Sequence, residues 1–81
     1  MIKEFSFSDF MNSSKDELYK QYLSRYITIV NKTTGQIRRT DKVVDILMSG
    51  DRNSTSLPIG FCMENSGIVE LFDNDVIRIY E

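Results

Sequence analysis

Histidine, tryptophan and alanine are absent from this sequence of 81 residues, and Cys62 is its single cysteine. Without histidine the chain cannot build a Ser-His-Asp triad, a Cys–His pair or the common zinc sites. One cysteine cannot form an internal disulfide, and a lone free thiol is typical of a reducing compartment. The four glycines are scattered, so no phosphate-binding loop or dinucleotide fingerprint is present. We therefore expect a cytoplasmic protein that is not an enzyme and holds no cofactor or metal.

Long apolar runs are also absent. The longest are only a few residues, far below the ~20 that a membrane-spanning helix requires. The first four residues, Met1–Glu4, lack the apolar core of a secretory signal. We expect no membrane segment and a single domain over Met1–Glu81, because domains rarely divide below about 100 residues.

Amino-acid usage points to an AT-rich source. Phe, Tyr, Met, Ile, Asn and Lys, which have AT-rich codons, total 32 residues, against ten for Gly, Ala, Arg and Pro. Such usage fits a low-GC bacterium, an AT-rich phage or some protists, and very short chains without alanine or histidine are common among small phage accessory proteins. If the chain is phage-encoded, its location is the host cytoplasm.

The net charge of −2 hides an asymmetry along the chain. Residues 1–42 carry eight basic against five acidic side chains, and residues 43–81 carry two against seven. The first half of the chain is thus basic and the second half acidic, and charge concentrated in this way can steer binding partners.

A capping box gives the clearest local signal. Ser14 and Glu17 have the S-x-x-E spacing in which each side chain accepts the other's backbone N–H at a helix start. Apolar residues then recur at helical spacing at Tyr19, Tyr22, Leu23 and Tyr26. This pattern predicts a principal amphipathic helix over 15–25 with these four residues on its buried face. On that basis Leu23→Ala should cost about 2–5 kcal/mol.

Strand patterns surround this helix. Residues 2–7 alternate as an edge strand does, or form an extended arm that packs its aromatic side chains, and 8–11 suit a single helical turn. The sequence predicts a β-hairpin that turns near Gly35 and pairs Tyr26–Val30 with Gln36–Thr40. Residues 41–49 fit either a short helix or a strand, and the spacing of Val43, Ile46 and Leu47 favours the helix.

Three further strands are expected in the second half, joined by short turn sequences. They cover Leu57–Met63, Ile68–Phe72 and Val76–Tyr80. Short connectors between successive strands predict an antiparallel meander. The fold class is therefore α+β, with the helix packed on a small antiparallel sheet (hairpin plus C-terminal three-strand meander) that could curl into a partial barrel. The inward residues should include Ile27, Ile29, Phe61, Ile68, Phe72 and Ile77.

Candidate chemical sites are weak. Cys62 lies between Phe61 and Met63, which favours a buried core residue. Glu70, Asp73 and Asp75 are hard-cation ligand types, but D-N-D is also a typical turn between strands. Asp51-x-Asn53-x-Thr55 resembles the start of a calcium loop, although Ser56 stands where that loop needs glycine. We therefore predict no metal site.

Because the sequence has no catalytic set, no cofactor-binding loop and no membrane segment, we predict a protein that acts by binding a larger protein, such as a phage-encoded inhibitor or modulator of a host enzyme. An acidic strand edge together with the polar loop of residues 51–56 could dock on a basic groove of that partner. The residues predicted to carry this contact are Asp51, Arg52, Asn53, Glu70, Asp73 and Asp75.

Two alternatives remain open. A nucleic-acid-binding module could use basic residues of the helix and hairpin with nearby tyrosines for stacking, although the sequence pI near 5.0 opposes it. The residues predicted for that surface are Arg25, Lys32, Arg38, Arg39 and Lys42. A homo-oligomer is the other alternative, since exposed sheet edges can pair between copies.

Overall fold

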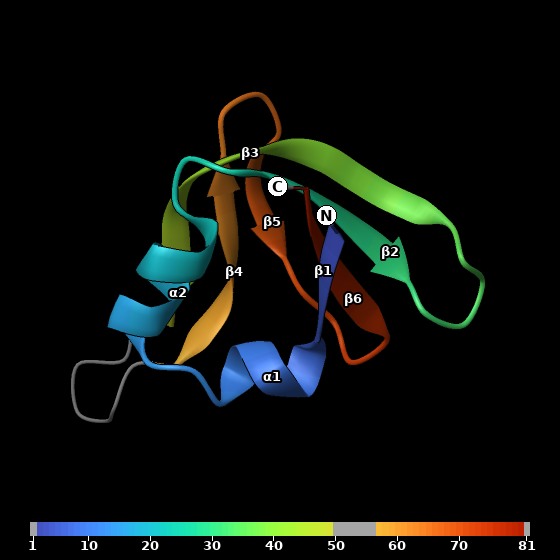
Figure 1. Ribbon diagram of the computed structural model, residues 1–81, viewed down its shortest axis with the longest axis horizontal. Coiled ribbons are helices and arrows are strands. Elements are labelled where there is room, and N and C mark those ends of the chain that lie inside the picture. The colour runs from blue at the N-terminus through green and yellow to red at the C-terminus, as the bar shows by residue number, and fades with distance from the viewer. Residues whose placement is uncertain (1, 50–56, 81) are drawn as a thin grey trace.

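The computed structural model describes residues 2–49 and 57–80, and it is a small α+β domain (Figure 1). The elements in chain order are β1 (Ile2–Ser6), α1 (Phe7–Met11), α2 (Lys15–Tyr22), β2 (Tyr26–Asn31), β3 (Ile37–Met48), β4 (Pro58–Met63), β5 (Gly67–Glu70) and β6 (Asp75–Tyr80). The predicted edge strand and helical turn at the start of the chain are confirmed as β1 and α1. Asp51, Arg52 and Asn53 lie outside the described residues.

The six strands form one antiparallel sheet in the order β1-β6-β2-β3-β4-β5, and this sheet is not closed into a barrel. The 12-residue strand β3 belongs to both halves of the sheet: its first part pairs with β2 and its second part pairs with β4. In Figure 1 β3 arches from β2 on one side of the molecule to β4 on the other. The sheet is therefore curled, with β1 and β5 as its end strands.

The predicted hairpin of β2 and β3 is confirmed, but the predicted meander is wrong in its last strand. β4 and β5 pair as expected, whereas β6 leaves β5 and inserts between β1 and β2. There its alternating residues Ile77 and Ile79 are buried. A short connector shows that two strands are close in sequence, but it does not decide which strand edge offers the larger apolar face.

The helix favoured over residues 41–49 is also wrong, because this segment continues β3. A register shift between Val43 and Asp45 inserts one extra residue into the strand. As a result Val43 and Ile46 both point inward and are buried, although they are three residues apart. A bulge in a strand thus produced the spacing that is typical of a helix.

The capping box of Ser14 and Glu17 is confirmed, but α2 ends at Tyr22. Leu23 is extended and Ser24 has a left-handed φ of 65°, which turns the chain so that the Ser24 N–H donates to the Val43 carbonyl oxygen at 2.8 Å. Leu23 and Tyr26 are therefore 39% and 56% exposed, and Leu18 takes their place in the core. The domain has two short helices in place of one principal helix.

The core lies between the two halves of the curled sheet. α1 contacts β1, β4 and β6 and so spans both halves, while α2 packs on β3 (Figure 1). Rings of Phe10 and Tyr22 pack edge-on against Phe61, with centroids 5.1 and 5.0 Å apart. The buried apolar cluster comprises Phe10, Leu18, Tyr22, Ile27, Ile29, Val43, Ile46, Phe61, Met63, Val69, Leu71, Ile77 and Ile79.

Four of the six predicted inward residues, namely Ile27, Ile29, Phe61 and Ile77, are confirmed. Ile68 and Phe72 are wrong: they are 68% and 56% exposed. Cys62 is only half-buried, so the core prediction for it is wrong as well. Cys62 and Ile68 are paired across β4 and β5, on the side of these strands opposite to the buried Phe61 and Val69.

We predict that Leu18→Ala lowers the free energy of unfolding by about 2–5 kcal/mol, because it leaves a cavity in the core. The matched control Leu23→Ala removes the same atoms from a partly exposed side chain and should cost less than about 1 kcal/mol. Urea denaturation followed by circular dichroism measures both. Equal losses would contradict the packing described for α2.

We also predict that Tyr22→Phe stabilises the protein by about 1 kcal/mol, since an unsatisfied buried hydroxyl carries a penalty of roughly 1–3 kcal/mol. The Tyr22 hydroxyl is buried and has no hydrogen-bond partner among the residues that the structure describes. The control is Tyr19→Phe, which removes a hydroxyl that donates to Asp45 Oδ1 at 2.7 Å and should lower stability. If thermal melting shows Tyr22→Phe to be less stable than the wild type, the hydroxyl is hydrogen-bonded in solution.

Candidate binding groove

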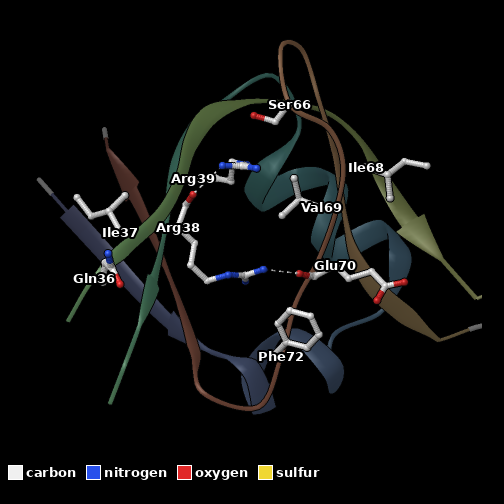
Figure 2. Close-up of a pocket in the computed structure, with 9 residues that line it drawn as sticks. All are labelled: Gln36, Ile37, Arg38, Arg39, Ser66, Ile68, Val69, Glu70 and Phe72. Carbon is white, nitrogen blue, oxygen red and sulfur yellow. Dashed lines mark hydrogen bonds between the residues drawn. The ribbon is translucent and has the colours of Figure 1, made fainter. Parts of the chain in front are cut away.

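A groove of about 420 Å³ opens between the first half of β3 and the edge strand β5 (Figure 2). Its two walls are Gln36, Ile37, Arg38 and Arg39 on one side and Ser66, Ile68, Val69, Glu70 and Phe72 on the other. Val69 is buried, whereas Ile37, Ile68 and Phe72 are exposed.

Arg38 spans this groove with its side chain. Its guanidinium forms an ion pair with Asp75 through Nη1, donates from Nη2 to the Glu70 carbonyl oxygen at 3.3 Å, and lies 4.9 Å from the centre of the Phe72 ring. Figure 2 shows the side chain reaching from β3 toward Glu70 and Phe72. The side chain thus takes over part of the bonding that a neighbouring strand would provide.

The carboxylate of Asp75 is only 2% exposed. Besides the ion pair with Arg38, its Oδ2 accepts the Phe72 N–H at 2.7 Å. Such a buried carboxylate is stabilised by its paired cation and by the backbone hydrogen bond. The sequence prediction placed Asp75 on a protein-binding edge and Arg38 on a nucleic-acid surface, but these two residues bind each other and are not available as free charges.

Asp41 is a second buried carboxylate, which the sequence prediction missed. It accepts the backbone N–H groups of Lys42, Asn65 and Ser66 at 2.7, 2.9 and 2.7 Å, and also the Ser66 hydroxyl and the Asn65 amide. Burial alone would raise its pKa, but the hydrogen bonds outweigh burial and hold the pKa of Asp41 well below its usual range. An aspartate between two strand residues has no local sequence signal for this long-range role.

The two carboxylates fix the two ends of β5. Asp41 on β3 holds Asn65 and Ser66 just before the strand, and Asp75 at the start of β6 holds Phe72 just after it. Close packing adds to this, because a Cβ at Gly60 of β4 would lie 2.1 Å from the Val69 carbonyl oxygen. Hydrogen bonds therefore anchor both ends of the edge strand β5, whose outer side pairs with none of the described strands.

The other predicted site residues are distributed over several surfaces. Glu70 and Asp73 are exposed near the groove, and Lys32 is exposed in the β2–β3 turn. Arg39 lines the groove, whereas Lys42, an odd number of residues along the same strand, points to the opposite face of the sheet beside Tyr26. Arg25 precedes β2 and is exposed. The five basic residues predicted for nucleic acid therefore do not form one surface.

Neither a metal cluster nor a membrane-spanning helix is found in the described part of the chain. Within residues 2–49 and 57–80, no three carboxylate or thiol side chains lie close enough to hold a metal ion. Over the same residues, no helix has the length and apolar character needed to cross a bilayer.

We predict that the hydrogen bonds to Asp41 make stability depend on pH. A lowered pKa means that folding favours the ionised form, so the stabilisation is present above the unfolded pKa of about 3.9 and is lost as pH falls toward the folded value. Asp41→Asn should lower the urea midpoint at pH 7, and its deficit relative to the wild type should shrink below about pH 4. A deficit that stays constant down to pH 2, or is absent at pH 7, would contradict this role.

Comparison with protein-family models, curated protein sequences and solved structures finds no match to this chain. A functional inference for the chain therefore starts from the groove, from the open edge of β5 and from the exposed side chains around them.

Proposed function

We propose that this chain is a non-catalytic protein that acts by binding another protein at the groove between β3 and β5. The observation that carries the proposal is the set of exposed large apolar side chains around this groove, Ile37, Ile68 and Phe72. Single exposed apolar residues are normal in soluble proteins, but several around one groove mark an interaction site.

The charges of the groove define what kind of partner surface would fit. Arg39 is exposed and donates to the Arg38 carbonyl oxygen at 3.2 Å, and within the described residues it forms no ion pair. Figure 2 shows the Glu70 side chain directed away from both arginines. An acidic and apolar partner segment would complement this groove. The proposed partner surface is therefore acidic, whereas the sequence analysis expected a basic one, because Asp75 of the expected acidic edge is buried.

The form of action that we propose is modulation of a larger host enzyme by a phage-encoded protein. Its support is the AT-rich residue usage, together with a binding groove whose polar lining has no histidine or cysteine for nucleophilic chemistry. Binding alone is sufficient for an inhibitor that covers a functional surface of its target.

A nucleic-acid-binding module is the second candidate, and the outer face of β2 and β6 supports it. Tyr26 and Tyr80 are both exposed there, and Lys42 lies opposite Tyr26. Exposed aromatic rings beside a cation can stack bases and contact phosphates. However, Arg78 on this face is paired with Glu4 at 3.0 Å, which leaves little net positive charge.

Affinity capture with two matched variants tests the proposed function. Ile68→Asp places a charge beside the groove, and Ile2→Asp makes the same change on the other edge strand, β1, where Ile2 is similarly exposed. The tagged chain and both variants are mixed with lysate of the source organism or its host, with and without nuclease.

We expect a protein that survives nuclease, is retained by Ile2→Asp and is reduced at least about tenfold by Ile68→Asp. The proposal is overturned if no protein is captured, if the protein is captured equally by both variants, or if capture is lost on nuclease treatment. In the last case the second candidate predicts affinity that falls steeply between about 50 and 200 mM salt.

A further inference from the structure

We infer that the partner is bound as an added β-strand: an extended segment of the partner protein pairs with the open edge of β5 and places an acidic side chain against Arg39. This inference rests on the proposed function and specifies its binding mode. It is carried by the backbone geometry of β5 and β3 and by the charge of the groove.

Alternate residues of an antiparallel strand direct their N–H and C=O groups to the same neighbour. The Leu71 N–H donates to the Ile59 carbonyl oxygen at 2.9 Å, in register with the β4–β5 pairs. Residues 67, 69 and 71 therefore face β4, and Ile68 and Glu70 present their backbone groups to the open side. The bond from Arg38 to the Glu70 carbonyl oxygen agrees with this assignment.

The opposite wall has an open edge too. The Val43 N–H donates to the Arg25 carbonyl oxygen at 3.0 Å. This bond shows which residues of β3 direct their backbone groups toward β2, because the direction alternates along the strand. Asp41 and Arg39 then face β2, and the backbone groups of Thr40 point away from it. An extended segment in the groove would meet hydrogen-bonding groups on β5 and on β3, and it would continue the curled sheet toward closure.

The edge strand is already fixed in the conformation that such binding needs. Asp41 and Asp75 hold the chain on both sides of β5, at Ser66 and Phe72. A preorganised edge loses little conformational entropy on binding, so more of the hydrogen-bond and apolar contact energy remains as affinity. Side chains of the added strand would alternate between the groove and solvent, which gives selectivity.

Charge complementarity favours a partner segment over a second copy of this chain. Arg39 offers guanidinium donors to a carboxylate without competition from an ion pair within the described residues. Two copies that paired through β5 would have only Glu70 of a four-residue strand to offer that guanidinium, and the Glu70 side chain is directed away from the arginines (Figure 2). A partner segment that carries Asp or Glu opposite Arg39 is therefore the better occupant.

Selection from a library of random peptides displayed on phage, followed by titration of the selected peptides, tests this inference without a known partner. Two pairs of variants of the full chain are compared. Glu70→Pro removes an open-edge N–H, and its control Glu70→Thr removes the same charge but keeps the N–H. Arg39→Glu reverses the groove charge, and its control Lys42→Glu makes the same change on the opposite face of β3. Thermal melting confirms that each variant is folded.

We expect the selected peptides to be free of proline and to combine alternating apolar residues with Asp or Glu. Glu70→Pro and Arg39→Glu should each weaken their binding at least about tenfold, and each control less than about twofold. In a ¹⁵N spectrum of the complex, the amides of Ile68 and Glu70 should become protected from hydrogen exchange.

Several outcomes overturn the inference. These are a library that yields no binder, peptides that bind Glu70→Pro as well as Glu70→Thr, or light scattering that shows a dimer dissociated by Glu70→Pro. If capture still depends on Ile68 in any of these cases, the proposed function stands and only the strand-addition mode is wrong. If capture also fails, both are wrong.

Discussion

The ion pair between Arg38 and Asp75 is the contact on which the open form of this sheet depends. A curled sheet of six strands that does not close must satisfy the groups along its gap in another way. Arg38 does this by reaching from β3 to the Asp75 carboxylate, the Glu70 carbonyl oxygen and the Phe72 ring. Removing either partner would leave a charge in a partly or fully buried position, which is more costly than losing an exposed pair. The same bridge places the guanidinium across the groove and so limits how much of the gap a bound segment can occupy.

Asp41 and Asp75 both bind other groups of the fold, so their charges are not available to a partner. Asp41 gathers five hydrogen bonds at the start of β5, and Asp75 is used at its end. The acidic second half of the chain therefore presents less negative charge near the groove than its composition indicates, while Arg39 remains exposed. Sequence charge asymmetry predicted an acidic binding edge, but Asp75 is buried and paired with Arg38, so the exposed charges that line the groove are Arg39 on the β3 wall and Glu70 on the β5 wall. Net charge along a chain is a poor guide to a local surface when long-range ion pairs cancel part of it.

Local signals predicted the parts of the fold that depend on near neighbours in sequence. The capping box of Ser14 and Glu17, the hairpin around Gly35 and the strand that contains Ile77 all rest on contacts or periodicities within a few residues. The errors all involve long-range choices. The position of β6 depends on competition between strand edges, the bulge in β3 imitates helical spacing, and the end of α2 depends on the bond from Ser24 to Val43. The groove could not be predicted, because it exists only between strands that are distant in sequence.

An open strand edge is a hazard as well as an opportunity, since it can pair with any extended chain. The two end strands of this sheet, β1 and β5, differ in how strongly their side chains oppose pairing with another chain. β1 carries Lys3 and Glu4, and Glu4 is paired with Arg78 across the strand, so charges protect much of that edge. β5 is only four residues long, which limits indiscriminate pairing, yet it exposes Ile68 and lies opposite the cationic side chain of Arg39. In the proposed strand addition, the four-residue length of β5 would limit pairing with other chains, and Arg39 on the opposite wall would favour a segment that carries a carboxylate. Selectivity of this kind would come from edge length and charge acting together, because neither alone distinguishes one extended segment from another.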